Sequence, residues 1–309
     1  MTGVASVAAP PLGAAAPGAA WLARARRRAA PWLLLLPAAT VLIPFFLLPL
    51  VALLRNSFNR DDPTALMVTD FTWVNYAQVV TDPLYLGSFV NSLAMAAAVT
   101  AVTLVFGYPF AYYLVRWAGR GSLALRWVIY TPLIVSVIAR VFGWMVIIAD
   151  SGLVNTALLT AGIIDEPLRL LFSAGGVFLG LAHRYFPLMV LPIASSIAKI
   201  DPALLRVSAG LGSRTVRTFF HVVLPLSLPG VVAGAQLVFA AVLSDFVMPL
   251  LMGSTRFRML APAIFDEAIG NVSWASAAAM AMVMLAVVAG MLLVTNRMFR
   301  LAAPWARTL

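Results

Sequence analysis

Six long apolar runs constrain this chain more than any other feature. They cover about residues 32–54, 87–115, 124–149, 171–198, 229–252 and 274–296. A run of roughly 18 or more apolar residues crosses a hydrocarbon layer of about 30 Å as an α-helix. The runs lack the alternation of a membrane β-barrel, and only 10% of the 309 residues are charged. The sequence therefore predicts an all-α, polytopic membrane protein with six transmembrane helices.

The basic residues predict which side of the membrane each connecting segment faces. Placing both termini in the cytoplasm puts 14 basic side chains and one acid, Asp201, on the inner side. The outer side then carries five basic side chains and nine acids. Inner loops of membrane proteins are enriched in arginine and lysine, so both termini are expected in the cytoplasm. The net charge of +10 is spread over these topology signals and does not indicate nucleic-acid binding.

The two ends of the chain are expected to lie outside the membrane. Residues 1–30, which are rich in alanine and end in "RARRR", are predicted to be a disordered basic tail. The apolar run that follows is longer than a secretory signal core and lacks a small-residue cleavage site, so it is expected to be a retained membrane helix. Residues 31–300 then form one six-helix membrane domain, and residues 301–309 form a short cytoplasmic tail.

Residues 199–228, called the connector below, are the only inner segment long enough to hold structure of its own. Asp201 before Pro202 predicts a helix start, because aspartate caps free amides and proline suits the first helical position. Gly212 is expected to end this helix in the left-handed conformation. The connector is therefore predicted to begin with a short helix that ends in a tight turn.

A second short helix is expected after that turn. Ser213 is expected to cap it, Pro225 to end it, and Pro229 to begin the fifth membrane helix. Two interpretations of the connector stay open on this reasoning. It is either an amphipathic segment lying on the membrane surface, or a handle by which a cytoplasmic partner moves the membrane helices.

The chain lacks the residues that most enzymatic and metal sites need. It has no cysteine, which excludes disulfides and thiolate ligands. Its histidines, His183 and His221, have no partner at ligand spacing. Its one lysine, Lys199, follows Ala198 and so cannot belong to a phosphate-binding loop. We therefore expect no bound metal or cofactor and no enzymatic activity.

Three charged residues remain inside the apolar runs: Arg140, Arg184 and Asp245. Such charges are costly at mid-membrane unless they are paired or face water. They either form an internal pair that locks helices together, or line a transport pathway on which Asp245 attracts a cationic solute. Two arginines beside one aspartate argue against a site built only for polycations, so zwitterionic solutes stay open.

Two pairs of glycines at four-residue spacing predict close helix contacts. The pairs are Gly176 with Gly180 and Gly230 with Gly234. Small residues at this spacing let the backbones of two membrane helices approach each other.

The spacing within the connector resembles the signature of binding-protein-dependent ABC importer permeases. In that signature a glycine is followed by nine residues, an aliphatic residue, one more residue and then Leu-Pro. The matching residues here are Gly212, Val222, Leu224 and Pro225. "FVNSLAMAAAVTAVTLVFGYPFAYYLVR" is similar to the second core helix of these permeases. "ARVFGWMVIIADSGLVNTALLTAGIIDEPLRLL" and "SDFVMPLLMG" resemble the spermidine/putrescine branch, which also contains opine importers. The resemblance covers roughly residues 32–300.

The resemblance implies a type I importer permease fold and a transport function. The connector would contain the coupling helix that docks on an ATP-hydrolysing subunit. The docking residues would be Leu205, Arg206, Ser208, Ala209, Gly212, Leu224 and Pro225. The cargo implied is a small amine-containing solute of the polyamine type, with an opine, an aminophosphonate or another small organic solute as the alternative.

The resemblance also implies the partners and the location. The partners are two copies of a cytoplasmic ATP-binding subunit, which uses ATP and Mg, a second homologous permease and an extracytoplasmic solute-binding protein. The chain would lie in the lipid of a bacterial plasma (inner) membrane. The rival class is a carrier driven by an ion gradient, which often shows repeated halves. Residues 32–149 and 171–296 show no convincing repeat, and a carrier needs no docking segment.

The connector departs from the family pattern at one place. Arg206, Val207 and Ser208 stand where the family usually has Glu-Ala-Ala. If the family's glutamate pairs with a basic group on the ATPase, Arg206 would repel that group. We therefore hypothesise that the partner of this chain carries a compensating acidic or neutral residue. The alternative is that the position tolerates any residue.

Overall fold

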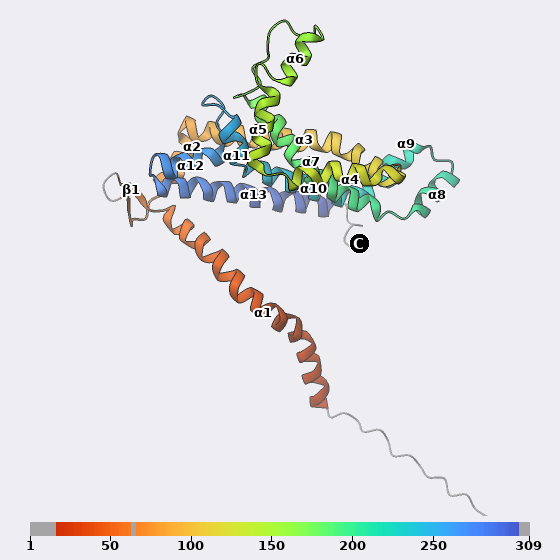
Figure 1. The fold of residues 1–309 in the computed structure, drawn as a ribbon. Helices are drawn as coiled ribbons and strands as arrows, with labels where there is room; N and C mark the ends of the chain where they lie inside the picture. Colours follow the sequence, from red (N-terminus) through yellow and green to blue (C-terminus); the bar gives the residue numbers. More distant parts are fainter. Residues whose placement is uncertain (1–16, 63–65, 303–309) are drawn as a thin grey trace, which may run out of the picture. The chain divides into compact units, whose positions relative to one another are not determined.

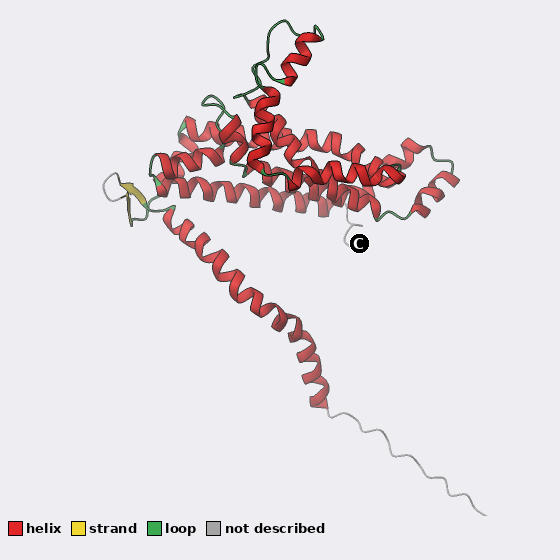
Figure 2. Ribbon diagram, in the orientation of Figure 1, coloured by secondary structure: helices red, strands yellow, loops and turns green. Residues whose placement is uncertain are grey.

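The computed structural model describes residues 17–62 and 66–302, which are almost entirely helical (Figure 2). The helices are α1 (Pro17–Asn56), α2 (Val74–Thr81), α3 (Pro83–Arg116), α4 (Ser122–Ile134), α5 (Val137–Ile148), α6 (Leu153–Thr160), α7 (Ala174–Ala198), α8 (Pro202–Gly210), α9 (Thr215–Thr218), α10 (Leu224–Leu243), α11 (Val247–Met252), α12 (Leu260–Phe265) and α13 (Trp274–Ala302). A 3-10 turn covers Gly119–Gly121, and π-helical turns cover Phe219–Val223 and Asp266–Gly270. The strands β1 (Arg60–Asp62) and β2 (Leu66–Val68) pair antiparallel.

Six helical segments of the described chain are long and apolar enough to cross a membrane. They are Leu35–Asn56, Pro83–Arg116, Val137–Thr160, Ala174–Ala198, Thr215–Leu243 and Trp274–Leu301. The predicted all-α architecture with six membrane helices is confirmed.

The first membrane helix begins earlier than expected. Among the described residues, those up to Leu53 form one unit and those from Leu54 onward form a second. Helix α1 starts at Pro17, so residues 17–30 of the predicted tail are helical and residues 1–16 lie outside the described part. Proline suits a first helical turn, and the alanines, leucine and arginines that follow are strong helix formers. At the other end, α13 runs to Ala302, and the rest of the predicted 301–309 tail is not described.

The third apolar run is two helices rather than one. α4 ends at Ile134, Val135 has extended backbone with ψ of 135°, and α5 starts at Val137. The prediction of one helix over 124–149 is therefore wrong. Hydropathy cannot detect this break, because the residues on both sides of it are apolar.

The fifth apolar run is longer on one side and shorter on the other than predicted. Helix continues from Thr215 through a π turn to Leu243, so Pro225 does not end it and Pro229 does not begin it. Proline lacks an amide hydrogen, and its ring is accommodated directly after the widened π turn. The helix then ends before Asp245, and α11 begins at Val247.

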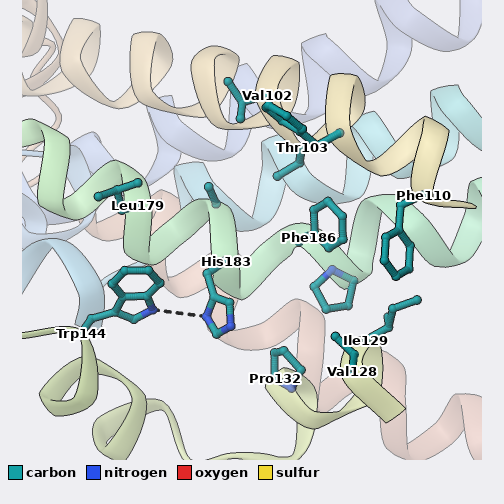
Figure 3. A pocket seen from close by; sticks show the side chains of 13 residues that line it. Val102, Thr103, Phe110, Val128, Ile129, Pro132, Trp144, Leu179, His183 and Phe186 are labelled. Atoms are coloured by element: carbon teal, nitrogen blue, oxygen red, sulfur yellow. Dashed lines mark hydrogen bonds between the residues drawn. The ribbon is translucent and has the colours of Figure 1, made fainter. Parts of the chain in front are cut away.

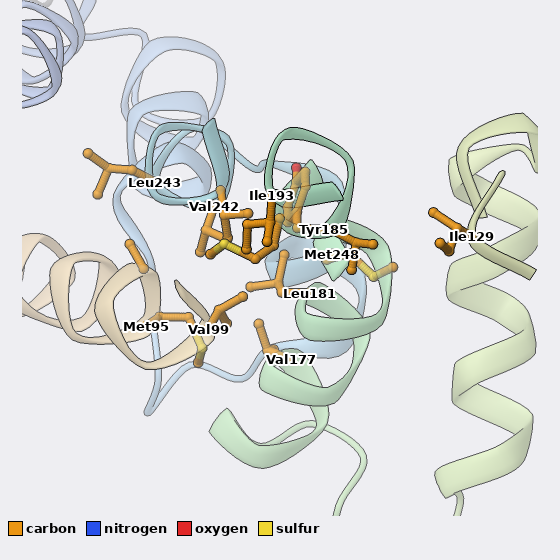
Figure 4. Packing of buried hydrophobic residues seen from close by; sticks show 14 of the residues in the cluster. Met95, Val99, Ile129, Val177, Leu181, Tyr185, Ile193, Val242, Leu243 and Met248 are labelled. Atoms are coloured by element: carbon orange, nitrogen blue, oxygen red, sulfur yellow. The ribbon is translucent and has the colours of Figure 1, made fainter. Parts of the chain in front are cut away.

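The core forms where α3, α7 and α10 lie side by side, with α13 along α10 (Figure 1). Figure 4 shows side chains of this core, among them Val99 of α3, Leu181 of α7 and Val242 of α10, all fully buried. The apolar residues of the three helices therefore face one another, as the mostly apolar composition of each run requires.

The predicted close approach of two helix backbones is confirmed for Gly230 and Gly234, whereas a Cβ on Gly176 would meet the carbonyl oxygen of Leu170 and one on Gly180 the side chain of Met248. A Cβ on Gly230 would lie 2.4 Å from the carbonyl oxygen of Pro192, and one on Gly234 would lie 3.0 Å from that of Met189. These two glycines bring the backbone of α10 directly against α7. Any larger residue would separate the two helices or distort them.

A small folded segment covers the Pro83 end of α3. Asn75 donates hydrogen bonds from Nδ2 to the carbonyl oxygens of Ser57 (2.9 Å) and Asn59 (2.8 Å). The carboxylate of Asp61 accepts from the backbone amides of Ala275 (2.8 Å) and Ser276 (2.9 Å). Asp61 thus satisfies free amides in the first turn of α13 and ties β1 to that helix.

Candidate functional site

The helices α8 and α9 of the connector lie beyond the ends of α7 and α10 (Figure 1). The carboxylate of Asp201 accepts from the amide of Ala203 at 2.8 Å, and Gly212 has a φ of +76°. The predicted start and end of α8 are therefore confirmed. The predicted cap on the second helix is wrong, because α9 has Arg214 at its N-cap without a side-chain bond. The hydroxyl of Ser213 is used elsewhere.

Three hydroxyl groups join the two connector helices. Ser208 Oγ lies 2.9 Å from Thr218 Oγ1, and Thr218 Oγ1 donates to Ser213 Oγ at 3.2 Å. The network links α8, the turn after it and the last residue of α9. The two short helices are thus held together as one piece.

The surface of the connector is open in the described chain. None of the residues of α8 or α9 is buried. Arg206, Ala209 and Gly212 are exposed, Leu205 and Ser208 are half-buried, and Leu224 and Pro225 are half-buried in α10. All seven predicted docking residues therefore lie in the connector, the last two of them at the start of α10.

Sequence reasoning missed the exposed aliphatic side chains of α8 and of Leu211, the residue that directly follows it. Leu204 is 47% exposed, Val207 60% and Leu211 82%. Their spacing of three and four residues, which places them on one helical face, was the available signal. An exposed aliphatic stripe of this kind is typical of a surface that is covered in an assembly.

The second candidate site is an ion pair between half-buried Arg184 and buried Asp245. Arg184 Nη1 of α7 lies 2.9 Å from Asp245 Oδ2, as a close ionic contact rather than an aligned hydrogen bond. Tyr185 donates its hydroxyl to the same oxygen at 2.6 Å, and the amide of Met248 donates to Oδ1 at 3.1 Å. Both oxygens of Asp245 therefore have partners, and its side chain is 1% exposed.

Arg140 does not join this pair. Its guanidinium donates to the carbonyl oxygen of Pro132 and, at 2.8 Å, to that of Val135. Those carbonyls lie at the end of α4 and in the break after it, so Arg140 stabilises the junction between α4 and α5. In the described residues no ion pair links Arg140 to Asp245. The arrangement favours the helix lock over the pathway for the Arg184–Asp245 pair.

Sequence reasoning named the charges of this site but not their neutral partners. Tyr185 follows Arg184 directly, and Met248 contributes only its backbone amide. For Tyr185, its position next to a charged residue inside an apolar run was a weak signal. Nothing in the sequence pointed to the backbone amide of Met248, since every residue except proline has an amide hydrogen.

Two cavities differ sharply in character. A cavity of about 410 Å³ between α3, α4, α5 and α7 has an almost wholly apolar lining, with Trp144 Nε1 donating to His183 Nδ1 at 3.2 Å (Figure 3). A polar cavity of about 550 Å³ lies near the Pro83 end of α3. Its ionisable lining residues are Arg60, Asp61, Asp70, Asp82, Tyr85 and Glu267. Among the described residues no cluster could hold a metal ion.

These features define a class of protein. Six apolar spans, two charged residues paired inside them and a basic connector with an open surface describe a membrane transport component. The chain belongs to the family of binding-protein-dependent transport system inner membrane components, whose sequence profile matches residues 103–307. It is therefore a multi-pass inner-membrane permease and not an enzyme, and the matched range includes both candidate sites.

Comparison with known proteins shows several similarities in detail. The chain is 33% identical over 260 residues to the spermidine/putrescine transport system permease protein PotB of Salmonella typhimurium, covering 84% of this chain and 90% of that protein. It is 32% identical to PotB of Escherichia coli K12, with 84% and 94% covered. A bacterial alginate ABC transporter, solved in complex with an alginate pentasaccharide-bound periplasmic protein, matches in fold with a TM-score of 0.73 at 16% identity. That match covers 91% of this chain and 97% of the solved one.

Proposed function

We propose that this permease carries a polyamine of the spermidine/putrescine type in an ATP-driven, binding-protein-dependent importer. The observation that carries the proposal is the similarity to the spermidine/putrescine permeases, which extends over 84% of the chain. The polar cavity adds support, because four of its lining residues are acidic and a cationic solute is attracted to such a surface.

The proposed partners follow from the open surfaces of the chain. Two copies of an ATP-binding subunit, which uses ATP and Mg, belong to the complex. One copy docks on the connector, because no residue of α8 or α9 is buried within the described chain. A second homologous permease completes the membrane part, and a solute-binding protein delivers the cargo from outside. The connector and both termini face the cytoplasm in this arrangement, in agreement with the distribution of arginine.

A second cargo class is favoured by one observation. The buried charges of the spans are two arginines and one aspartate, and the carboxylate of Asp245 is already occupied by Arg184 and Tyr185. Guanidinium groups recognise carboxylates and phosphonates. An opine, an aminophosphonate or another small zwitterion therefore remains the alternative to a polyamine.

Reconstitution of the native complex tests the proposal. The tagged chain is purified gently from its own membranes, and the proteins that accompany it are identified. The complex and its binding protein are then placed in liposomes, and the uptake of labelled spermidine, putrescine, an opine and 2-aminoethylphosphonate is measured with and without ATP. ATP-dependent uptake of spermidine supports the proposal, and uptake of a zwitterion alone selects the second cargo class. Uptake by the isolated chain without ATP would make it a carrier.

A further inference from the structure

We infer that α3 receives the movement of the connector, through Arg116 at one end of the connector and through Tyr108 and Tyr112 at the other. The inference rests on the proposed function, in which an ATP-binding subunit pushes on α8 and α9. It concerns what happens next, namely which membrane helix takes up the displacement. Two separate sets of contacts lead to the same nine-residue stretch of α3.

The first set lies where the chain enters the connector. Arg116 is the last residue of α3, and its Nη2 lies 3.1 Å from the carbonyl oxygens of both Ile197 and Ile200. Ile197 is in the last turn of α7, and Ile200 directly precedes Asp201, the cap of α8. A cation that donates to the free carbonyls at a helix end is a favourable contact. Arg116 therefore fastens α3 to the point at which α8 begins.

The second set lies where the chain leaves the connector. Phe219 opens the π turn after α9, and the rings of Tyr108 and Tyr112 meet it edge to face, with centroids 5.6 and 5.7 Å away. The hydroxyl of Tyr108 lies 2.8 Å from Ser227 Oγ in α10, and both residues are buried. Aromatic pairs and buried hydrogen bonds of this kind hold two elements at a fixed spacing.

Apart from the helix that continues from α9 through the π turn into α10, the two short connector helices have little other support in the described chain. α8 packs chiefly on α9, and the hydroxyl network between Ser208 and Thr218 holds the two helices together. When α8 and α9 move as one piece, the displacement must therefore be transmitted to other helices at the two ends of the connector. Residues 108–116 cover about two and a half helical turns, and they hold both ends. The end of α3 is thus obliged to move with the connector.

The same helix reaches the opposite end of the bundle. Ser92 Oγ of α3 accepts from the amide of Leu260 at 2.7 Å, and Asn91 donates from Nδ2 to the carbonyl oxygen of Arg258 at 3.1 Å. Arg258 lies in the segment between α11 and α12, and Leu260 is the first residue of α12. α3 therefore joins the connector to the α11–α12 segment through direct hydrogen bonds at both ends.

The test uses the complete importer, reconstituted with its ATP-binding subunit and binding protein. The quantity measured is the amount of solute transported per ATP hydrolysed. For Arg116→Gln we expect an intact complex that still hydrolyses ATP and a ratio that falls roughly tenfold, because a charged donor to two carbonyls is lost. Arg116→Lys should restore part of the ratio. Tyr108→Phe, which removes one hydroxyl and keeps the ring, should lower it roughly threefold.

Tyr113→Phe is the matched control, because Tyr113 lies on the same turns of α3 but is 48% exposed. An unchanged ratio in both Arg116→Gln and Tyr108→Phe would overturn the inference. Loss of the ATP-binding subunit from these variants would also overturn it, since the residues would then shape the docking surface. If the Arg116→Gln chain itself does not fold, the transport ratio of Tyr108→Phe decides the test. A wild-type complex without ATP-dependent uptake would instead refute the proposed function, and the inference with it.

Discussion

The guanidinium of Arg184 lies 2.9 Å from the carboxylate of Asp245, and this contact joins α7 to the break between α10 and α11. Removing one partner of a buried pair leaves the other charge uncompensated, at a cost of about 3–5 kcal/mol. We therefore expect Arg184→Met to destabilise the assembled permease by about that amount. Thermal unfolding of the purified complex measures the loss.

A double variant separates the two interpretations of this pair. Arg184→Met with Asp245→Leu removes both charges, and such replacements are often neutral in buried sites. If the pair is a helix lock, the double variant should assemble and transport solute. A double variant that assembles normally but does not transport would show that the pair belongs to the pathway.

Gly230 controls how closely α10 approaches α7. A Cβ at this position would lie 2.4 Å from the carbonyl oxygen of Pro192, so Gly230→Ala should cost about 1–3 kcal/mol through overpacking. Gly290→Ala in α13 is the control, because no atom lies within 4 Å of its added Cβ. Equal melting temperatures for the two variants would contradict the expected contact.

Gly212 is needed for its backbone conformation rather than for space. Its φ is +76°, and an added Cβ would meet nothing within 4 Å, so Gly212→Ala should cost the turn about 1–2 kcal/mol. Gly210→Ala is the control, because Gly210 lies in α8 and also has open space around it. Limited proteolysis of the connector should be faster for Gly212→Ala only. Similar cleavage rates in both would argue against a required left-handed turn.

Arg206 tests the departure of the connector from the family pattern. It is exposed, and in the described chain it forms no ion pair. If the docking subunit has a complementary acidic residue, Arg206→Glu should lower transport several-fold at low ionic strength and less at high ionic strength, because salt screens exposed charges. Arg126→Glu on α4 is the control. Unchanged transport in Arg206→Glu would mean that the position tolerates either charge.

Local signals in the sequence were sufficient for much of this fold. Hydropathy predicted the number of spans, and Asp201 and Gly212 marked the ends of α8, because capping and left-handed turns depend on a single residue and its neighbours. The glycine spacing likewise predicted the contact of Gly230 and Gly234 with α7.

The breaks in the third and fifth runs depend on residues that are distant along the chain or in other elements. The gap after Ile134 is stabilised by the side chain of Arg140, and the gap at Asp245 by Arg184 and Tyr185 of another helix. A hydropathy window averages over such a gap and cannot detect it. The contacts of Arg116 with α7 were hidden for the same reason, since an arginine at the end of a span first indicates topology.

The continuous helix from Thr215 to Leu243 limits how this chain can vary in length. Inserting or deleting one residue within it would rotate all later residues of α10 by about 100°. Gly230 and Gly234 would then turn away from α7, and Tyr108 would lose its contact with either Phe219 or Ser227. Among homologous chains, insertions in the connector should therefore be confined to the turn around Gly212, while the helix after it keeps its residue count.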